Sequence, residues 1–365
     1  MISILVSFLV ALVSTLFIIR LSRQHKNILD HVTHDVQRFH SRPVPRFGGL
    51  GILIAALVGA SVACWRAPPV GQWLLLLLLC ALPAFGCGIV EDYTKNVSAM
   101  RRLMLTMAAA AIGYIALDAA ITRIDLPLVD GWLKYAWLSL PFTVFAVGGI
   151  ANAINIVDGF NGLASVVTMF MLLSIAYVAW QVNDTFIMTA AFIMVGAIAG
   201  FFVWNFPYGL IFLGDGGAYF IGFMLGELTV LLIARNPQVS AWYALLLLIY
   251  PVFETLFSIY RKRFVRGGSP GVPDGIHLHM LIFKRLVRWT IGRRDARALI
   301  KRNSLTSPYL WVLSLMAVIP ATLFWRNCWI LIGFCLCFVA AYVWLYMQIV
   351  QFNAPRWMII RRQKK

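Results

Sequence analysis

Long apolar runs divide this sequence and set the environment in which it can fold. Eleven runs have close to the length of about 20 residues that a helix needs to cross a bilayer. Their approximate bounds are 2–20, 48–65, 72–90, 102–120, 133–151, 163–180, 185–204, 217–234, 240–259, 308–325 and 328–350. The core of one water-soluble domain cannot bury this much apolar surface. The sequence therefore predicts an all-α fold, a polytopic bundle of about eleven transmembrane helices.

Composition agrees with a membrane protein, because 61% of the residues are hydrophobic and only 12% are charged, against roughly a quarter charged in soluble domains. The first run has no basic segment before it and no small-residue cleavage site after it, so we expect a retained span. No internal repeat or soluble domain interrupts the chain. We predict one integral-membrane domain, 1–365, with cytoplasmic loops at 21–47, 91–101, 152–162, 205–216 and 260–307.

Lysine and arginine give the orientation, because they accumulate in cytoplasmic loops. If successive runs alternate in direction, all but five of the 31 basic residues fall on one side of the membrane. The five exceptions are Arg66, Arg123, Lys134, Arg235 and Arg326. We therefore expect a periplasmic N-terminus and a cytoplasmic C-terminus. The net charge of +17 suits anionic lipid headgroups, and its scatter along membrane-proximal loops argues against nucleic-acid binding.

Four clusters of polar residues follow the third, fifth, seventh and ninth runs, so all four fall on the predicted cytoplasmic side. They are Glu91–Asn96, Asn152–Leu163, Phe212–Ala218 and Asp274–His279. Residues kept for separate structural reasons would not be expected to sort onto one side. We therefore predict a single active site at the cytoplasmic face.

Asp215 and the asparagine segment indicate a divalent cation. Asp215 follows a glycine in a turn that a ligand can approach closely, and Mg²⁺ needs only one or two protein oxygens beside substrate phosphates. Asn152 and Asn155 lie three residues apart and share a helical face, which Asp158 continues. Polar side chains at the end of a membrane span are costly unless they are used. The alternative for Asp215 is an ordinary helix cap.

The acidic pair and the histidines are weaker signals when each is taken alone. Glu91 and Asp92 repel each other, which favours a cation or a shared proton between them, although two solvated acids at a helix end would look the same. His277 and His279 are two residues apart, so an extended loop would present both on one side. There, histidine can contact phosphate or move a proton. Zinc has no third ligand at a recognisable spacing.

In order and spacing, these clusters resemble the polyprenyl-phosphate N-acetylhexosamine 1-phosphate transferase superfamily (glycosyltransferase family 4), and within it the WecA- and WbpL-like branch. The similarity starts at the RPVPRFGG segment, residues 42–49, and includes the acidic pair. It continues through NxxNxxDGxxGL at 152–163 and FxGD at 212–215, and it ends in the histidine loop at 269–280. Five motifs in register with eleven spans make the resemblance specific over nearly the whole chain.

The resemblance implies a role for each matching residue. The implied catalytic residues are Glu91, Asp92, Asp158 and His279. The implied ligands of Mg²⁺, for which Mn²⁺ can substitute, are Asn155 and Asp215. The residues implied to bind substrate are Arg42, Arg46, Asn152, Asn161, Arg261, Arg266 and His277.

Some positions depart from the pattern of the family and bear on the sugar more than on the reaction. Glu91 stands where an aspartate is usual, Met280 replaces a histidine, and Asn161 replaces an acid. Glu254 fills an acidic site near the end of the ninth run. We expect it to pair with Arg261 or with a neighbouring helix and to take no direct part in catalysis.

The reaction implied by the resemblance is attack of undecaprenyl phosphate on the sugar-bearing phosphorus of a UDP-HexNAc, which releases UMP and starts an O-antigen or another surface polysaccharide. A phosphomonoester has a second pKa of about 6, so the lipid phosphate is largely ionised at neutral pH and needs little help from a base. The implied setting is the bacterial inner membrane, with membrane lipids as partners, and a homodimer is left open. GlcNAc, GalNAc, FucNAc and QuiNAc remain open, as does a covalent two-step mechanism.

Two other functions are weighed against this one. An MraY-like phospho-MurNAc-pentapeptide transferase is less favoured, because the triple-histidine pattern of that enzyme is absent. A transporter of the same lipid would place polar residues near the bilayer midplane, often in repeated halves. Here the polar residues follow the ends of the runs and no repeat is visible. A purely structural membrane scaffold would leave the clusters of amides and acids unexplained.

The orientation leads to a labelling prediction. A cysteine that replaces Lys95, or one placed next to His279, is expected to resist a membrane-impermeant thiol reagent in intact cells, because both positions are predicted to face the cytoplasm. A cysteine at Lys134, predicted on the other side, is the matched control and is expected to react. The parent chain with its six native cysteines sets the background. Labelling near Lys95 from outside would overturn both the orientation and the argument for a single site.

Overall fold

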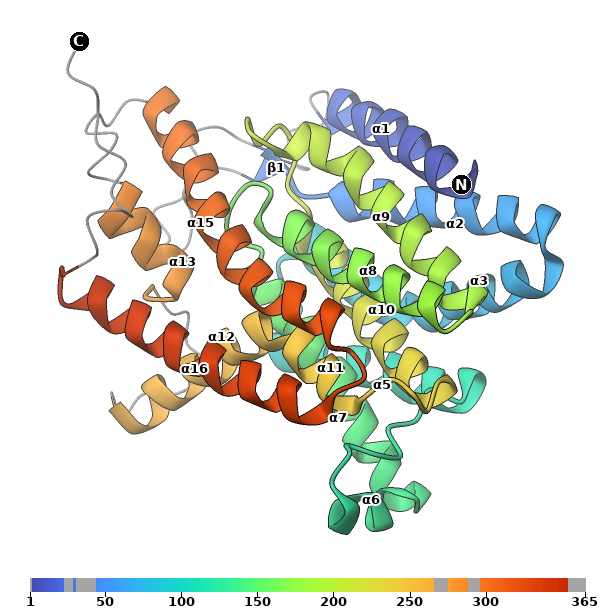
Figure 1. Ribbon diagram of the computed structural model, residues 1–365. Coiled ribbons are helices and arrows are strands. Elements are labelled where there is room, and N and C mark those ends of the chain that lie inside the picture. Colours follow the sequence, from blue (N-terminus) through green and yellow to red (C-terminus); the bar gives the residue numbers. More distant parts are fainter. Residues whose placement is uncertain (1, 23–28, 31–43, 266–274, 288–295, 354–365) are drawn as a thin grey trace.

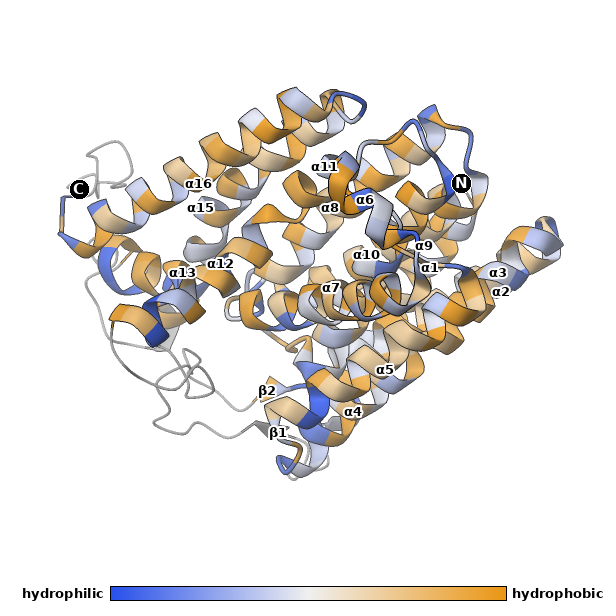
Figure 2. Ribbon diagram, turned by 90° about the horizontal axis from the view of Figure 1, so that it is seen from below, coloured by the Kyte–Doolittle hydropathy of each residue, from blue (hydrophilic) through white to orange (hydrophobic). Residues whose placement is uncertain are grey.

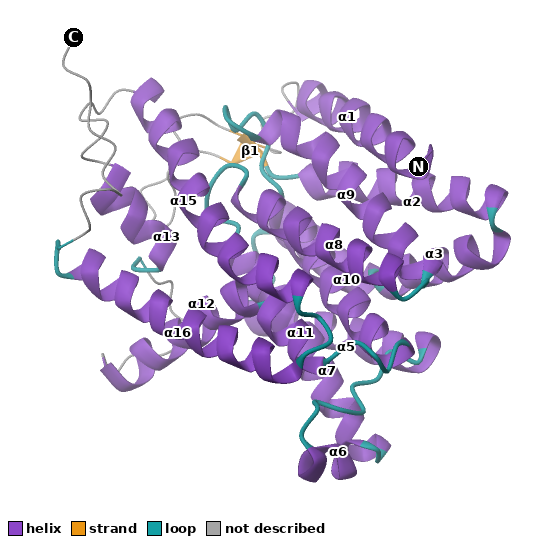
Figure 3. Ribbon diagram, in the orientation of Figure 1, coloured by secondary structure: helices purple, strands orange, loops and turns teal. Residues whose placement is uncertain are grey.

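A computed structural model of the chain describes residues 2–22, 29–30, 44–265, 275–287 and 296–353. Within these residues nearly every element is a helix (Figure 3). Helices satisfy their backbone polar groups internally, which a segment surrounded by lipid requires. The exception is one pair of two-residue antiparallel strands, β1 (Leu29–Asp30) and β2 (Val44–Pro45). In this pair Leu29 lies opposite Pro45, and Asp30 lies opposite Val44.

The helices follow one another with short connections (Figure 1). The first eight are α1 (Ile2–Ser22), α2 (Gly48–Arg66), α3 (Pro68–Cys80), α4 (Leu82–Thr94), α5 (Ala99–Leu117), α6 (Pro127–Leu133), α7 (Ala136–Val157) and α8 (Leu163–Gln181). Those after them are α9 (Thr185–Asn205), α10 (Gly214–Arg235), α11 (Ala241–Leu247), α12 (Ile249–Tyr260), α13 (Leu278–Leu281), α15 (Ala296–Leu323) and α16 (Cys328–Val350). Two π-helical segments, η2 (Arg261–Val265) and η3 (Ile282–Val287), extend α12 and α13.

The prediction of an all-α membrane bundle is confirmed. Nine helices of the described residues are long and apolar enough to cross a bilayer, and eleven spans result if each of two bent pairs is one span. The pairs are α3 with α4, bent by 44°, and α11 with α12, bent by 69°. Pro83 and Pro251 lie just after the two breaks, and each lacks the N–H that would continue the preceding helix. The orientation of the termini stays a prediction.

Two helices extend beyond the predicted runs into segments expected to be loops. α7 continues to Val157, so Asn152 and Asn155 lie in its last turns and not in a loop at 152–162. α15 begins at Ala296, well before the run predicted at 308–325, so the end of the expected loop 260–307 is helical. Apolar content marks only the part of a helix that lipid can cover, and a polar extension carries no such signal.

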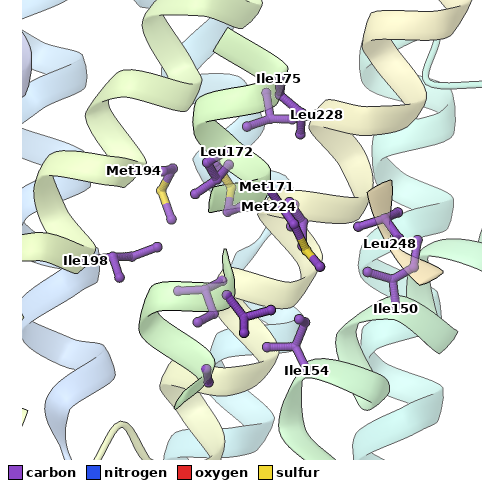
Figure 4. Packing of buried hydrophobic residues seen from close by; sticks show 14 of the residues in the cluster. Ile150, Ile154, Met171, Leu172, Ile175, Met194, Ile198, Met224, Leu228 and Leu248 are labelled. Atoms are coloured by element: carbon purple, nitrogen blue, oxygen red, sulfur yellow. The ribbon is translucent and has the colours of Figure 1, made fainter. Parts of the chain in front are cut away.

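The core of the bundle surrounds α10. Every residue from Gly216 to Leu232 is buried, as expected for a helix that is apolar on all sides and has other helices around it. Its side chains Met224 and Leu228 pack among residues of α7, α8 and α9, such as Ile154 and Met194 (Figure 4). Hydrophobic residues cover most of the helices (Figure 2). α10 is therefore a central post, and its first turn is held in a fixed place.

The molecule has two distinct ends, because α6 and β1 lie far apart along the bundle (Figure 1). The α6 end is fastened by ion pairs. Arg123 pairs with Asp125 at 2.6 Å and also donates to the carbonyl of Val239 at 2.6 Å. Near it, Nε of Arg235 donates to Asp184 at 2.7 Å. Arg123 and Arg235, two of the basic residues predicted on the outer side, thus share one end of the molecule.

Close packing of α4 on the first turn of α10 gives a prediction about stability. A Cβ atom added to Gly88 would overlap the backbone nitrogen of Gly216, whereas one added to Gly86, in the same helix, would meet nothing within 4 Å. Gly88→Ala is therefore expected to cost about 1–3 kcal/mol, the usual range for overpacking, and to lower the melting temperature in detergent. Gly86→Ala is the matched control and is expected to be neutral or stabilising. Equal melting temperatures for the two variants would contradict this packing.

Candidate active site

The start of α10 is built against the segment that precedes α2. The N–H groups of Gly48 and Gly49 donate to the carbonyls of Phe212 and Leu213 at 3.0 and 2.9 Å. Gly214 has φ +76°, and a Cβ there would overlap the Arg46 carbonyl oxygen, so only glycine fits without strain. The RPVPRFGG and FxGD motifs, far apart in sequence, therefore meet as one structural unit.

Asp92, at the end of α4, caps α10. Its Oδ1 accepts from the N–H of Asp215 at 3.0 Å and its Oδ2 from the N–H of Gly216 at 2.9 Å. The side chain is only 6% exposed. The first N–H groups of a helix lack partners within the helix, and the helix dipole favours a carboxylate there. The helix cap considered for Asp215 is thus made by Asp92, and the side chain of Asp215 points to other groups.

The carboxylate of Asp215 lies between an amide and a guanidinium. Oδ1 accepts from Nδ2 of Asn155 at 3.2 Å, and Oδ2 forms an ion pair with Nη1 of Arg102. The guanidinium also lies 5.9 Å from the ring centre of Tyr219, whose hydroxyl donates to Oδ1 of Asn152 at 3.2 Å. Asn152 and Asn155 therefore face α10 together, as their spacing predicted. The side chains of Asp215 and Arg102 are 20% and 17% exposed, so solutes can reach them.

These residues provide a partial set of ligands for a hard cation. Asp215 and Asn155 offer carboxylate and amide oxygens side by side, provided that the Asn155 amide rotates to turn Oδ1 toward the site. Over the described ranges no group of three or more His, Cys, Asp or Glu residues could hold a metal. Mg²⁺ does not need such a group, since water and substrate phosphates supply most of its ligands. The donor set fits Mg²⁺, and the metal assignment stays a prediction.

Asp158 directly follows α7 and belongs to the same end of the bundle. Removal from water raises the pKa of its carboxyl from 3.8 to about 7. The positive charge of Arg46 lowers this pKa, and the negative charge of Asp92 raises it further. The three charged groups are therefore within electrostatic reach of one another. A carboxyl with a pKa near 7 suits proton transfer at neutral pH.

The histidine loop approaches the same turn. A Cβ on Gly159 would lie 3.2 Å from Nε2 of His279, and the Phe160 ring meets the His279 ring in a T-shaped contact, with centroids 5.7 Å apart. His277 stacks on His279 with a ring separation of 5.2 Å and an angle of 4° between the rings. Nδ1 of His277 is 3.0 Å from Oε1 of Glu254. The structure therefore brings the histidine loop to the asparagine segment.

Two other predicted contact residues lie in packed surroundings at the edge of this cluster. Arg261 donates from Nη1 to the hydroxyl of Tyr346 in α16 at 3.0 Å. Glu91 accepts from the N–H of Val97 at 2.7 Å and so holds the loop after α4. Their roles in the reaction stay predictions.

Asn161 joins its loop to neighbouring elements. Its Nδ2 donates to the carbonyl of Pro207 at 3.1 Å, and its backbone N–H donates to Oδ1 of Asn303 in α15 at 2.8 Å. The residue is 5% exposed. The two remaining predicted substrate residues, Arg42 and Arg266, lie outside the described residues.

Arg102 and Tyr219 contact the cluster although sequence reasoning gave neither a role. A signal for Tyr219 was present, because it lies four residues after Asp215 and so on the same face of α10. Arg102 begins an apolar run, where a basic residue is typical of the cytoplasmic end of a span. Its ion pair with Asp215 depends on the packing of α5 against α10, and the local sequence does not contain that contact.

The fold and the cluster define a class: a multi-pass helical membrane protein with carboxylates, amides and a histidine loop gathered at one end of a buried helix. Residues 74–233 match the model of a known family, Glycosyl transferase family 4. The chain belongs to this family of transferases.

Individual relatives give the same picture. The chain is 27% identical over 287 residues to a probable undecaprenyl-phosphate N-acetylglucosaminyl 1-phosphate transferase of Bacillus subtilis, a match that covers 76% of this chain and 77% of that protein. It is 26% identical over 255 residues to an undecaprenyl-phosphate alpha-N-acetylglucosaminyl 1-phosphate transferase of Thermotoga maritima, covering 70% and 73%. A phospho-N-acetylmuramoyl-pentapeptide-transferase of Bartonella quintana is 31% identical over 217 residues, covering 53% and 60%.

The environment of Asp158 predicts how stability changes with pH. Because its pKa is about 7 in the folded protein and ordinarily 3.8, folding favours the protonated form. The wild type is therefore expected to lose stability relative to Asp158→Asn as the pH rises from about 4 to about 7. Unfolding midpoints in detergent at several pH values measure this difference. The exposed Asp118, replaced by Asn, serves as control, and a difference between wild type and Asp158→Asn that is the same at every pH would contradict the burial argument.

Proposed function

We propose that this protein transfers a HexNAc 1-phosphate from a UDP-sugar to undecaprenyl phosphate and releases UMP, which begins a lipid-linked surface polysaccharide such as an O-antigen. The observation that carries the proposal is the hydrogen-bonded cluster of Asp92, Asn155 and Asp215, three residues from separate motifs, in a chain of this family. The names of its relatives in Bacillus and Thermotoga describe the same kind of transfer. We place the enzyme in the bacterial inner membrane, with this cluster at the cytoplasmic face.

Transfer of a phosphoryl group needs positioning and charge neutralisation more than covalent chemistry. Asp215 and Asn155 would hold Mg²⁺, which supplies positive charge to the diphosphate when it is bound. Asp92 acts on Asp215 by fixing the first turn of α10, since both of its oxygens accept from that turn. Arg102 brings a second positive charge to the same place and can pass from Asp215 to a substrate phosphate.

Proton transfer falls to the other half of the cluster. The lipid phosphate has a second pKa of about 6, so only a minority carries a proton at neutral pH. The carboxyl of Asp158, with a pKa of about 7 and with Arg46 nearby, is suited to accept that proton. Glu91 and Asp92 were the residues first expected to do so, but both carboxyls already accept from backbone N–H groups. His279, against Gly159, would hold phosphate oxygens beside Asp158.

The sugar is the open part of the proposal. The relatives in Bacillus and Thermotoga favour GlcNAc, and the relative in Bartonella keeps a MurNAc-pentapeptide donor under test. The purified protein, given undecaprenyl phosphate, Mg²⁺ and one UDP-sugar at a time, is expected to form a single class of lipid product. Mass analysis of the lipid identifies the sugar phosphate, and UMP is expected to appear in equal amount. The panel comprises UDP-GlcNAc, UDP-GalNAc, UDP-FucNAc, UDP-QuiNAc and UDP-MurNAc-pentapeptide.

Variants measured in the same assay test the cluster. Asp215→Asn is expected to abolish transfer at every Mg²⁺ concentration, because it removes the charge of the one carboxylate that would bind the metal. Asn155→Ala is expected to raise the Mg²⁺ requirement with a smaller loss, since an amide is the weaker ligand. Asp118→Asn, an exposed aspartate outside the cluster, is the matched control. No lipid product with any donor would reject the proposed function, and near wild-type turnover of Asp215→Asn would reject the site.

A further inference from the structure

Glu254 of α12 is the most completely bonded acid next to the histidine loop. It is fully buried and accepts three hydrogen bonds. Oε1 is 3.0 Å from Nδ1 of His277 and 3.1 Å from the N–H of Leu278, and Oε2 accepts from the hydroxyl of Tyr342 at 2.7 Å. An ionised carboxylate has acceptor sites only, and three donors match that chemistry. Glu254 therefore joins α12, the histidine loop and α16.

The expected partner for Glu254 was Arg261 or a neighbouring helix, and the helix is confirmed, since Tyr342 belongs to α16. A link between α12 and α16 alone would use Oε2 and leave Oε1 without a task. Oε1 instead receives two donors from the residues that begin α13. An acid in the bundle interior is costly unless it is fully paired. Its placement is therefore explained by the histidine loop and not by helix packing alone.

The aromatic residues around Tyr342 fix the third donor. Its ring meets Phe253 edge to face at 5.0 Å and Phe257 at 5.6 Å, both on α12. Rings packed this way resist rotation, so the hydroxyl stays directed at Glu254. The carboxylate is thus held from α16 while it holds the loop.

The bond to Glu254 sets both the tautomer and the plane of His277. With a carboxylate oxygen at Nδ1, the neutral ring carries its proton there and leaves Nε2 as an acceptor. The His279 ring lies parallel to that plane, at 4° and 5.2 Å. His279 in turn rests on the backbone of Gly159, next to Asp158. A chain of contacts therefore runs from Glu254 to the turn at the candidate active site.

We propose that Glu254 is a positioning residue for the transfer reaction. It holds His277 through Nδ1, and the stacked pair of rings keeps His279 against the turn at 158–160. Glu254 itself need not touch the substrate. This inference rests on the proposed function in one respect, that His279 takes part in the reaction.

Kinetics of single variants give the first test. Glu254→Gln keeps the shape and loses the charge, and it is expected to lower kcat by about 10–100-fold, the range found when the group that orients a functional histidine is removed. KM for the UDP-sugar is expected to change little. Tyr342→Phe removes only the donor to Oε2 and is expected to give a smaller loss of kcat, which also serves if Glu254→Gln does not fold.

Tyr250→Phe is the matched control for Tyr342→Phe. Tyr250 is also a fully buried tyrosine and lies in α12, but its hydroxyl has no hydrogen-bond partner among the described residues. Its removal is expected to leave kcat at the wild-type value. Equal losses for the two variants would assign the effect to core packing and overturn the inference.

A double-mutant cycle separates positioning from an independent effect. If Glu254 acts through His279, the variant that combines Glu254→Gln with His279→Ala is expected to be no slower than His279→Ala alone. Losses that multiply would show that Glu254 acts by another route and would overturn the inference. An undiminished rate for His279→Ala alone would instead remove the histidine loop from the proposed function.

A readout without substrate keeps the two proposals apart. ¹⁵N-histidine spectra of the full chain in detergent, which has six histidines, are expected to show one neutral ring with its proton on Nδ1. This signal should vanish in both His277→Gln and Glu254→Gln. If it persists in Glu254→Gln, the inference fails even when sugar phosphate is transferred. If it depends on Glu254 but no donor is used, the hold on His277 stands and the proposed transferase function falls.

Discussion

The carboxylate of Asp92, bound to the first two free N–H groups of α10, is the contact on which the geometry of the cluster depends. It joins α4 to a helix that begins 123 residues later in the chain. A carboxylate suits this place for two reasons, the unpaired N–H groups and the positive end of the helix dipole. Because the side chain of Asp215 starts from the same turn, its position relative to Asn155 and Arg102 follows from this cap. A motif that looked like a pair of free acids thus contains one acid that shapes the site.

Much of the fold was predictable because lipid imposes a simple rule on sequence. A run of about 20 apolar residues has to be helical, so the bounds of α2, α8 and α16 agree with the predicted runs to within about two residues. The rule fails where a helix leaves lipid. The polar first turns of α15 and the last turns of α7 have no apolar signal, and they were expected to be loops. The bends before Pro83 and Pro251 were visible only as prolines inside long runs.

The site was predictable as a set and not as a network. The count of lysines and arginines placed four clusters on one side, and contacts do join residues of all four: Asp92, Asn155, Asp215 and His279. The partner of each side chain was not predictable. The Asp92 cap, the ion pair of Arg102 and the bond between Glu254 and His277 all link distant segments, and packing of whole helices decides them. Asn161 shows the reverse case, since a residue from a functional motif is spent on holding α15.

The burial of α10 on all sides means that the helix carrying Asp215 has almost no contact with lipid. Bilayers differ in thickness, and a helix that faces lipid responds by tilting or by drawing the bilayer in around it. Such adjustments act first on outer helices such as α1 and α16, whose side chains are widely exposed. They reach Asp215 only after passing through a layer of tightly packed neighbours. The geometry at the start of α10 is thereby insulated from the lipid composition of the membrane, and the outer helices absorb the mismatch.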